Sequence, residues 1–164
     1  MDYILISIES QFQIFCKFKF ENSKSKLKMI TVESTINASI EKVWELWTAP
    51  EHVMKWNNAS EDWHTPFAQN DLKVGGKFKY TMASKDGTMR FDFEGIYTAV
   101  TNHSLIEYKL ADDRKVKITF ENQGDKVVLT EKFDPETVNS EALQQQGWQA
   151  ILDNFKKYVA TSTF

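Results

Sequence analysis

The residues best able to do chemistry in this chain are three histidines and a few acidic side chains. The histidines are His52, His64 and His103, and no two of them have the spacing of a pair of metal ligands. We expect His52 and His103 to be solvated at the surface. His64 follows Trp63 in a segment expected to rim a cavity, where it could touch a ligand. The sequence holds no nucleophile elbow, phosphate-binding glycine loop or dinucleotide fingerprint. It therefore predicts no catalytic residues, no metal and no cofactor.

Three acidic residues fall in predicted strands. Asp92 and Glu94 lie on the strand face opposite Phe91 and Phe93, so we expect them to face solvent. Glu107 has two interpretations. It faces solvent, or it points inward, where a buried carboxyl group could act as an acid or a base. The second interpretation would favour an enzyme.

Aromatic side chains stand out, with 12 Phe, 5 Trp and 5 Tyr among 164 residues. Large aromatic residues dominate both protein cores and the walls of ligand cavities. They could fill a solid core, or they could surround a cavity in which Tyr80, Tyr97 and Trp148 offer polar groups that orient a ligand. The residues predicted to line such a cavity are Trp63, His64, Phe78, Tyr80, Phe91, Phe93, Tyr97, Phe120, Trp148, Leu152 and Phe155.

The elements that would position these residues begin at residue 30. Residues 30–36 largely alternate between apolar and polar side chains, which is typical of a half-buried strand. Ser39 is a good N-cap for the helix that follows. Thr48 and Glu51 have capping-box spacing, with a proline between them. This pattern predicts a second short helix through about Trp56.

A loop-rich segment is expected over residues 57–76, and five short strands follow it. Asp86-Gly87 between the first two strands is a strong hairpin signal. The strands are predicted at Lys77–Ala83, Met89–Val100, Leu105–Leu110, Arg114–Glu121 and Lys126–Phe133. From Ser140 to Val159 the apolar residues recur with a helical period, and Asn139 could cap this helix.

Short strands joined by hairpins imply an antiparallel sheet, and the apolar face of such a sheet must be covered. The C-terminal helix is the only long helix available to cover it. The sequence therefore predicts an α+β helix-grip fold over residues 29–164. In this fold a curved antiparallel sheet of about six strands wraps around the long helix, and two short helices follow the first strand.

Residues 1–28 differ from the rest of the chain in charge. They carry 5 lysines and 3 acidic residues, a net charge of +2, whereas residues 29–164 carry 15 basic and 20 acidic residues, a net charge of −5. The segment does not have the pattern of a signal peptide. It is either an appended strand or an extension that precedes a natural start at Met29. We favour the extension, because the pattern from Met29 onward is that of a complete domain.

The net charge of the whole chain is −3, and no run of Lys and Arg resembles a nucleic-acid-binding surface. We therefore expect no nucleic-acid partner. A single cysteine, Cys16, excludes an intrachain disulfide and is compatible with a cytoplasmic protein. No apolar run is long enough to span a membrane. Either a monomer or a homodimer would fit.

Three stretches together resemble one protein superfamily. They are Thr35–Ala38 leading into Val43–Glu51 and Trp56, then Gly75–Met82 continued by Asp86-Gly87 and Phe91–Tyr97, and finally Gly147–Tyr158. In order and spacing they resemble the START-like superfamily, also called SRPBCC. Within it they look most like the group related to the C-terminal domain of the activator of the heat-shock-protein-90 ATPase.

This resemblance implies the helix-grip fold and a cavity between its sheet and its long helix. Relatives in the superfamily bind lipids, sterols, hormones or polyketide-like aromatic molecules in this cavity, and a minority catalyse cyclisation or dehydration there. The resemblance does not extend to residues 1–28, and it covers only the C-terminal module of the activator.

Three functions follow as hypotheses. The first is binding of a small hydrophobic or aromatic molecule, without chemistry. The second is interaction with a chaperone in the stress response, as the resemblance implies. The third is a polyketide cyclase or dehydratase, which would need an inward-facing acid or histidine such as Glu107 or His64.

Overall fold

Seven strands and three helices make up residues 28–163, the part of the chain that the computed structural model describes. The strands are β1 Ile30–Ile36, β2 Trp63–Asn70, β3 Lys77–Ser84, β4 Arg90–Thr101, β5 Leu105–Leu110, β6 Lys115–Asn122 and β7 Val127–Phe133. The helices are α2 Ile40–Thr48, α3 Pro50–Trp56 and α4 Glu141–Thr161. Residues 1–27 lie outside the described residues. The structure therefore tests neither of the two hypotheses about the N-terminal segment.

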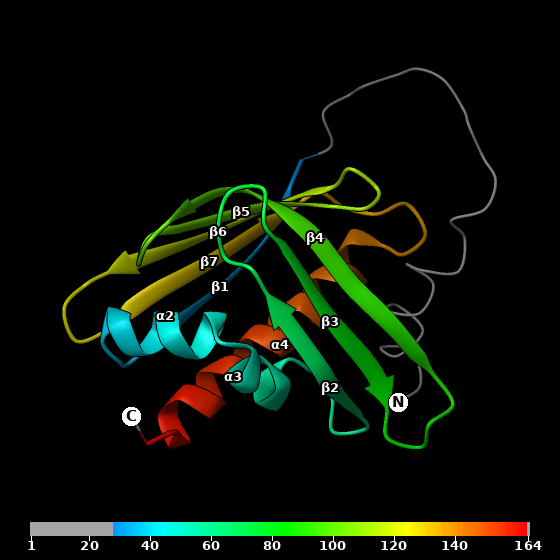
Figure 1. Ribbon diagram of the computed structural model, residues 1–164, viewed down its shortest axis with the longest axis horizontal. Helices are drawn as coiled ribbons and strands as arrows, with labels where there is room; N and C mark the ends of the chain where they lie inside the picture. The colour runs from blue at the N-terminus through cyan, green and yellow to red at the C-terminus, as the bar shows by residue number, and fades with distance from the viewer. Residues whose placement is uncertain (1–27, 164) are drawn as a thin grey trace.

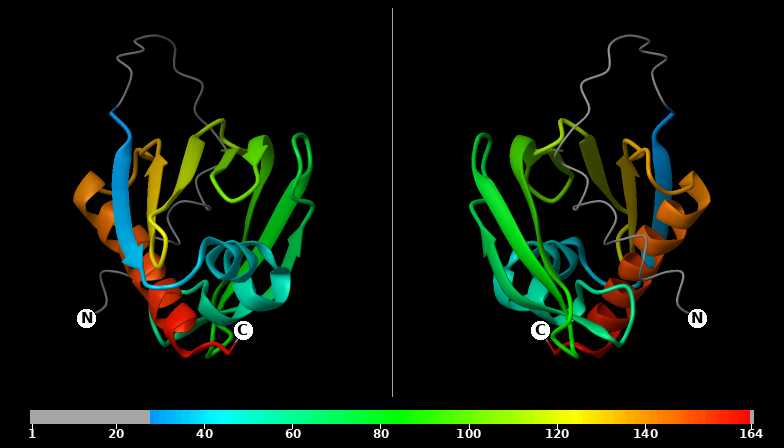
Figure 2. Two further views of the ribbon diagram at one scale, coloured as in Figure 1. Left: turned by 90° about the vertical axis from the view of Figure 1, so that its left-hand side faces the viewer. Right: turned by 90° about the vertical axis from the view of Figure 1, so that its right-hand side faces the viewer.

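All seven strands join one antiparallel sheet in the order β1-β7-β6-β5-β4-β3-β2. Hairpins connect the strands from β2 to β7. The first strand, β1, pairs with the last strand, β7, along its whole length. Ile30 of β1 lies opposite Phe133, and Ile36 lies opposite Val127. The sheet curves strongly, so that β1 and β2 stand at opposite sides of it (Figure 2).

The helices close this curved sheet. α4 crosses behind the strands in Figure 1 and packs on β1 and on α3, while α2 and α3 lie side by side at one end of the sheet. Ser39 caps α2, because its Oγ accepts a hydrogen bond from the backbone N–H of Lys42 at 3.3 Å. The predicted α+β helix-grip fold is confirmed.

One strand was not predicted. β2 occupies Trp63–Asn70, in the segment where the sequence predicts loops. It lies at the edge of the sheet, its pairing with β3 is interrupted between His64 and Phe67, and it contains Pro66. Proline is tolerated at a sheet edge or a bulge, and the bulge removes the alternation by which strands are identified. The loop prediction for this segment is therefore wrong.

Two predicted helix caps are also wrong. α2 continues through Thr48, whose hydroxyl donates to the Trp44 carbonyl at 2.8 Å, so no capping box forms with Glu51. α3 has Ala49 at its N-cap and Pro50 in its first turn. At α4 the cap is Ser140 rather than Asn139, and its Oγ accepts from the backbone N–H of Leu143.

Aromatic rings lock the three helices together at one end of the interior. Trp47 of α2 stacks on Trp56 of α3 with ring centres 4.7 Å apart, and both rings contact Phe155 of α4 at 4.8 Å. Leu152 and Phe155 are fully buried beneath them. Side chains thus fill this end of the space between the sheet and α4.

Candidate functional site

Next to this packed end, a cavity of about 110 Å³ remains between the inner face of the sheet and α4. Every strand except β1 contributes to its wall, together with all three helices. The lining residues are Trp47, Thr48, Trp56, Asn57, Asn70, Phe78, Tyr80, Met82, Phe91, Phe93, Tyr97, Ile106, Tyr108, Ile118, Glu131, Gln144, Gly147, Trp148 and Ile151. Most of them are aromatic or aliphatic, and no Lys, Arg or His is among them.

The sheet side of the wall is built around Phe78. Its ring centre lies 4.7 Å from that of Tyr108, 5.1 Å from Tyr80, 5.3 Å from Tyr97 and 5.7 Å from Phe93. These residues come from β3, β4 and β5, where alternate side chains point to the same face of the sheet. Contacts between rings at these distances make the wall rigid as well as apolar.

The helix side of the wall is formed by Trp148 of α4. Its indole stacks on Phe133 of β7, with centres 4.0 Å apart and ring planes 14° apart. It also contacts Phe93 of β4, with ring centres 6.1 Å apart and ring planes 78° apart. Trp148 and Phe93 are both half-buried, so the cavity comes close to the surface between β4 and α4.

A chain of polar groups runs along one side of the wall. The Tyr97 hydroxyl donates to Asn70 Oδ1 at 2.7 Å, and Asn70 Nδ2 donates to the Thr48 carbonyl at 2.6 Å. These bonds join β4, β2 and α2. Burial raises the pKa of Tyr97 far above its usual value and that of Tyr80 to about 12, so both phenols keep their protons.

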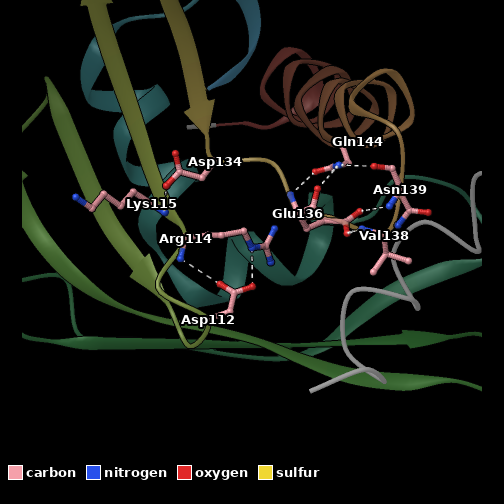
Figure 3. A network of polar contacts seen from close by, with 8 residues as sticks. All are labelled: Asp112, Arg114, Lys115, Asp134, Glu136, Val138, Asn139 and Gln144. Atoms are coloured by element: carbon pink, nitrogen blue, oxygen red, sulfur yellow. Dashed lines mark hydrogen bonds and ion pairs between the residues drawn. The ribbon is translucent and has the colours of Figure 1, made fainter. Parts of the chain in front are cut away.

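Gln144 fixes the first turn of α4 at the edge of the cavity. Its side chain is 1% exposed and accepts from the backbone N–H of Glu136 at 2.9 Å. The same side chain donates to the carbonyls of Glu136 and Asn139 at 3.2 Å and 2.9 Å. The Glu136 carboxylate in turn accepts from the backbone N–H groups of Val138 and Asn139 (Figure 3). This network ties the connection after β7 to the start of the helix.

Glu131 is the only acidic residue of the wall. It lies on the inner face of β7 between Leu129 and Phe133, and it is 5% exposed. Burial alone raises the pKa of its carboxyl group from 4.5 to about 8. Unlike Gln144, it has no hydrogen-bond partner among residues 28–163.

Gly147 leaves an open space on the helix side of the cavity. It is buried, yet a Cβ added at this position would meet no atom within 4 Å. Glycine costs about 1 kcal/mol relative to alanine inside a helix. The missing side chain therefore keeps room in the cavity at some cost in helix stability.

The family model described as "Activator of Hsp90 ATPase homolog 1-like protein" matches residues 37–160, which includes all of these lining positions. The chain belongs to this family.

Solved structures agree with the assignment to the Activator of Hsp90 ATPase homolog 1-like family. The chain is 43% identical to the AHSA1-like protein from Aeromonas hydrophila, covering 80% of this chain and 92% of that one, with a TM-score of 0.77. It is 53% identical to a protein from Cytophaga hutchinsonii, covering 83% and 97%, with a TM-score of 0.71. A protein from Nitrosomonas europaea at 17% identity, covering 81% and 94%, shares the fold with a TM-score of 0.69. No curated protein matches the chain.

In this family member, the structure brings together only part of the predicted cavity wall. Phe78, Tyr80, Phe91, Phe93, Tyr97 and Trp148 do line the cavity. The residues that do not line it are Trp63, His64, Phe120, Leu152 and Phe155. Leu152, Phe155 and Phe120 belong to the packed core, and the buried Trp63, the first residue of β2, contacts Phe91. Phe120, Leu152 and Phe155 were assigned inward from strand or helix phase, which cannot tell cavity wall from filled core, whereas Trp63 and His64 were expected in a loop at the rim.

The other residues singled out in the sequence lie elsewhere. Glu107 pairs with Lys117 at 3.1 Å on the outer face, and Asp92 pairs with Lys79 at 2.7 Å. The outward position predicted for Asp92 is confirmed, and the inward alternative for Glu107 is wrong. The third hypothesis, a cyclase or dehydratase, thus loses the two residues named for it, because His64 does not line the cavity either.

The predicted solvation of His52 and His103 is wrong in detail. Both are half-buried. His52 Nδ1 lies 2.7 Å from the Tyr158 hydroxyl, which joins α3 to α4. His103 adopts a φ of 60° and contacts the Trp44 ring edge-on at 5.6 Å. Both histidines serve packing between elements.

Sequence reasoning missed Glu131, Tyr108 and Gln144. The alternation along β7 does place Glu131 on the same face as Val127, Leu129 and Phe133, so an inward acid could have been found there.

Within residues 28–163 no helix is long and apolar enough to cross a membrane. The same residues contain no group of three or more His, Cys, Asp or Glu side chains able to hold a metal ion.

Proposed function

We propose that the protein binds a small uncharged aromatic or apolar molecule in the cavity between the sheet and α4. The observation that carries this proposal is the cavity itself. Rigid aromatic rings enclose it, it has few polar groups, and a buried glycine leaves space open on its helix side. Apolar cavities with a small number of polar groups are the usual sites for small ligands.

The cavity volume limits the size of the ligand. Its volume of about 110 Å³ is small compared with a drug-sized pocket of roughly 300–1,000 Å³. An engineered apolar cavity of about 150 Å³ in another protein binds benzene. The comparison favours a molecule of about one substituted ring and disfavours a sterol or a long fatty acid, unless Trp148 and α4 move.

The test is native mass spectrometry of protein purified from its own cells, combined with thermal-shift assays on a panel of one-ring compounds. We expect a copurified small molecule or a saturable rise in melting temperature with at least one class of compound. The matched control is Gly147→Leu, whose side chain would occupy the cavity without touching the surface. Equal responses from the wild type and this variant would refute the proposal.

A second candidate function rests on the family match, whose description names an activator of the Hsp90 ATPase. On this hypothesis the domain contacts an Hsp90-type chaperone and would act in the cytoplasm during stress. The assay is ATP hydrolysis by the chaperone of the same organism with increasing amounts of this protein. Stimulation that Gly147→Leu leaves unchanged would support a surface role independent of the cavity, and no stimulation at large excess would eliminate this function.

A further inference from the structure

Glu131 puts a carboxyl group into the wall of an otherwise apolar cavity. On β7 it pairs in register with Val32 of β1 and with Ile118 of β6, both apolar. It is 5% exposed, and no group among residues 28–163 forms a hydrogen bond or ion pair with it. Buried polar groups are normally hydrogen-bonded, so an unpartnered acid on a cavity wall requires an explanation.

Among residues 28–163, no cation is placed to neutralise this acid. The cavity wall contains no Lys, Arg or His, and α4 faces it with Gln144, Gly147, Trp148 and Ile151, none of which can be charged. The basic group whose charge reaches the wall is Arg114, before β6, where it acts on Tyr108. Its Nε donates to Asp112 Oδ2 at 2.6 Å (Figure 3), so it is already paired.

Glu131 therefore carries its proton at neutral pH. A buried carboxylate without a counter-ion is strongly disfavoured, and burial accordingly raises the pKa of Glu131 to about 8. The other titratable groups of the wall are Tyr80, Tyr97 and Tyr108, whose pKa values are all raised, so they too are uncharged. A neutral carboxyl group has an O–H donor. Among residues 28–163, no hydrogen-bond partner takes up this donor.

Tyr108 supplies a second donor of the same kind. It is 7% exposed, lines the cavity, and has no hydrogen-bond partner among the described residues. It lies on β5, two strands from Glu131 and two residues away from it in register, because Tyr108 is level with Phe133 and Ile106 is level with Glu131. The two backbone positions are thus about 10 Å apart across the sheet and about 7 Å apart along it. Both side chains reach from there into the same space, and the charge of Glu131, when present, would raise the pKa of Tyr108. The other wall hydroxyls already have partners: Tyr97 donates to Asn70, Thr48 donates to the Trp44 carbonyl, and Tyr80 is hydrogen-bonded to Tyr97.

We propose that Glu131, as a neutral acid, and the Tyr108 hydroxyl together donate hydrogen bonds to an acceptor oxygen of the ligand, such as the carbonyl oxygen of an aryl ketone, aldehyde, ester or amide. This inference rests on the proposed function and narrows its ligand class. A carboxylate ligand is excluded, because it would bring a second negative charge to a wall without a cation. A plain hydrocarbon leaves both donors unpaired.

Four probes of nearly equal shape separate these cases: acetophenone, α-methylstyrene, 1-phenylethylamine and benzoate. Their dissociation constants are measured by NMR titration of the full chain near pH 6.5. A hydrogen bond to a neutral group is worth a factor of roughly 3–10 in affinity. We expect acetophenone to bind more tightly than α-methylstyrene by at least this factor, and benzoate not to bind.

Variants of Glu131 and Tyr108 test which residues cause the preference for acetophenone. Glu131→Leu should reduce the advantage of acetophenone over α-methylstyrene by roughly 3-fold or more, whereas Glu131→Gln, which keeps an N–H donor, should retain most of it. Tyr108→Phe should reduce the advantage by roughly 3-fold or more. Tyr158→Phe is the matched control, because it removes a tyrosine hydroxyl that bonds to His52 outside the cavity, and it should leave all four affinities unchanged.

A pH series and a spectroscopic measurement complete the test. Between pH 7 and about pH 9 the affinity of the wild type for acetophenone should fall by roughly tenfold as Glu131 ionises, and that of Glu131→Gln should not. The carbonyl ¹³C resonance of labelled acetophenone should move downfield on binding, and less so in Glu131→Leu.

The outcomes separate the two proposals. Equal binding of acetophenone and α-methylstyrene to the wild type would overturn the carbonyl inference and leave the cavity as an apolar site. Tightest binding of 1-phenylethylamine, abolished by Glu131→Gln, would also overturn it, since the acid would then act as a carboxylate. Binding of none of the four would overturn the inference together with the proposed one-ring ligand.

Discussion

Adding a side chain at Gly147 should stabilise the protein and at the same time abolish binding. Gly147 lies within α4, is buried, and faces open space. Replacing glycine by alanine in a helix gains about 1 kcal/mol, and a buried methyl group adds up to about 0.8 kcal/mol. We therefore expect Gly147→Ala to raise the free energy of unfolding by about 1–2 kcal/mol. For a domain of this size the melting temperature should rise by roughly 3–6 °C.

The assay is urea denaturation of the wild type, Gly147→Ala and Gly147→Leu, followed by titration with acetophenone. Gln146→Ala is the control, because Gln146 is the exposed neighbour on the same helix, and its stability should change by no more than about 0.5 kcal/mol. Gly147→Leu should remain folded and lose binding by at least about tenfold. A loss of more than about 1 kcal/mol in Gly147→Ala would refute the reasoning, since it would show that the space is already filled.

Three further predictions concern stability. Because the pKa of Glu131 is raised from 4.5 to about 8, the stability of the wild type should fall as pH rises between these values, by at most about 1.4 kcal/mol per pH unit. Calorimetry over this pH range should show no such fall for Glu131→Gln. Parallel pH profiles of the two proteins would contradict the burial of this acid. Gln144→Leu should cost about 2–4 kcal/mol in urea denaturation by stranding the backbone groups of Glu136 and Asn139, whereas the exposed Gln146→Leu should change little. Gly76→Ala should lower the stability by about 2–4 kcal/mol, because the added Cβ would lie 1.9 Å from the Asp71 carbonyl oxygen. Gly75→Ala should lower it by only about 1–2 kcal/mol, because Gly75 has a positive φ but open space around it. Equal melting temperatures of the two variants would refute this difference.

The architecture could be predicted because period, caps and turns are local properties of the sequence. The alternation of residues 30–36 and the helical stripe up to Val159 each report which face is buried, and the structure confirms both elements. β2 escaped prediction because Pro66 and the irregularity after His64 remove its alternation, while edge pairing with β3 supplies its strand geometry. That pairing is a tertiary effect which no local pattern reports.

The site was harder to predict than the fold. Phe78 and Phe155 both point inward, yet only Phe78 borders open space, because a cavity is the difference between the volume enclosed and the volume filled. That difference depends on Gly147 lacking a side chain, a property that the helical pattern does not register. Glu131 was overlooked for another reason. Strand phase places it inward, but buried acids are rare, so an acidic residue in a strand is expected to face solvent.

On the proposed function, the space between the sheet and α4 binds a small uncharged aromatic molecule. The most direct measurement is a ¹H–¹⁵N NMR titration of the full chain with acetophenone, run in parallel on Gly147→Leu. We expect saturable shifts in the wild type around Phe93, Tyr108, Glu131 and Trp148, and none in the variant. Shifts that do not saturate, or that map to the outer face of the sheet, or that are equal in both proteins would contradict it.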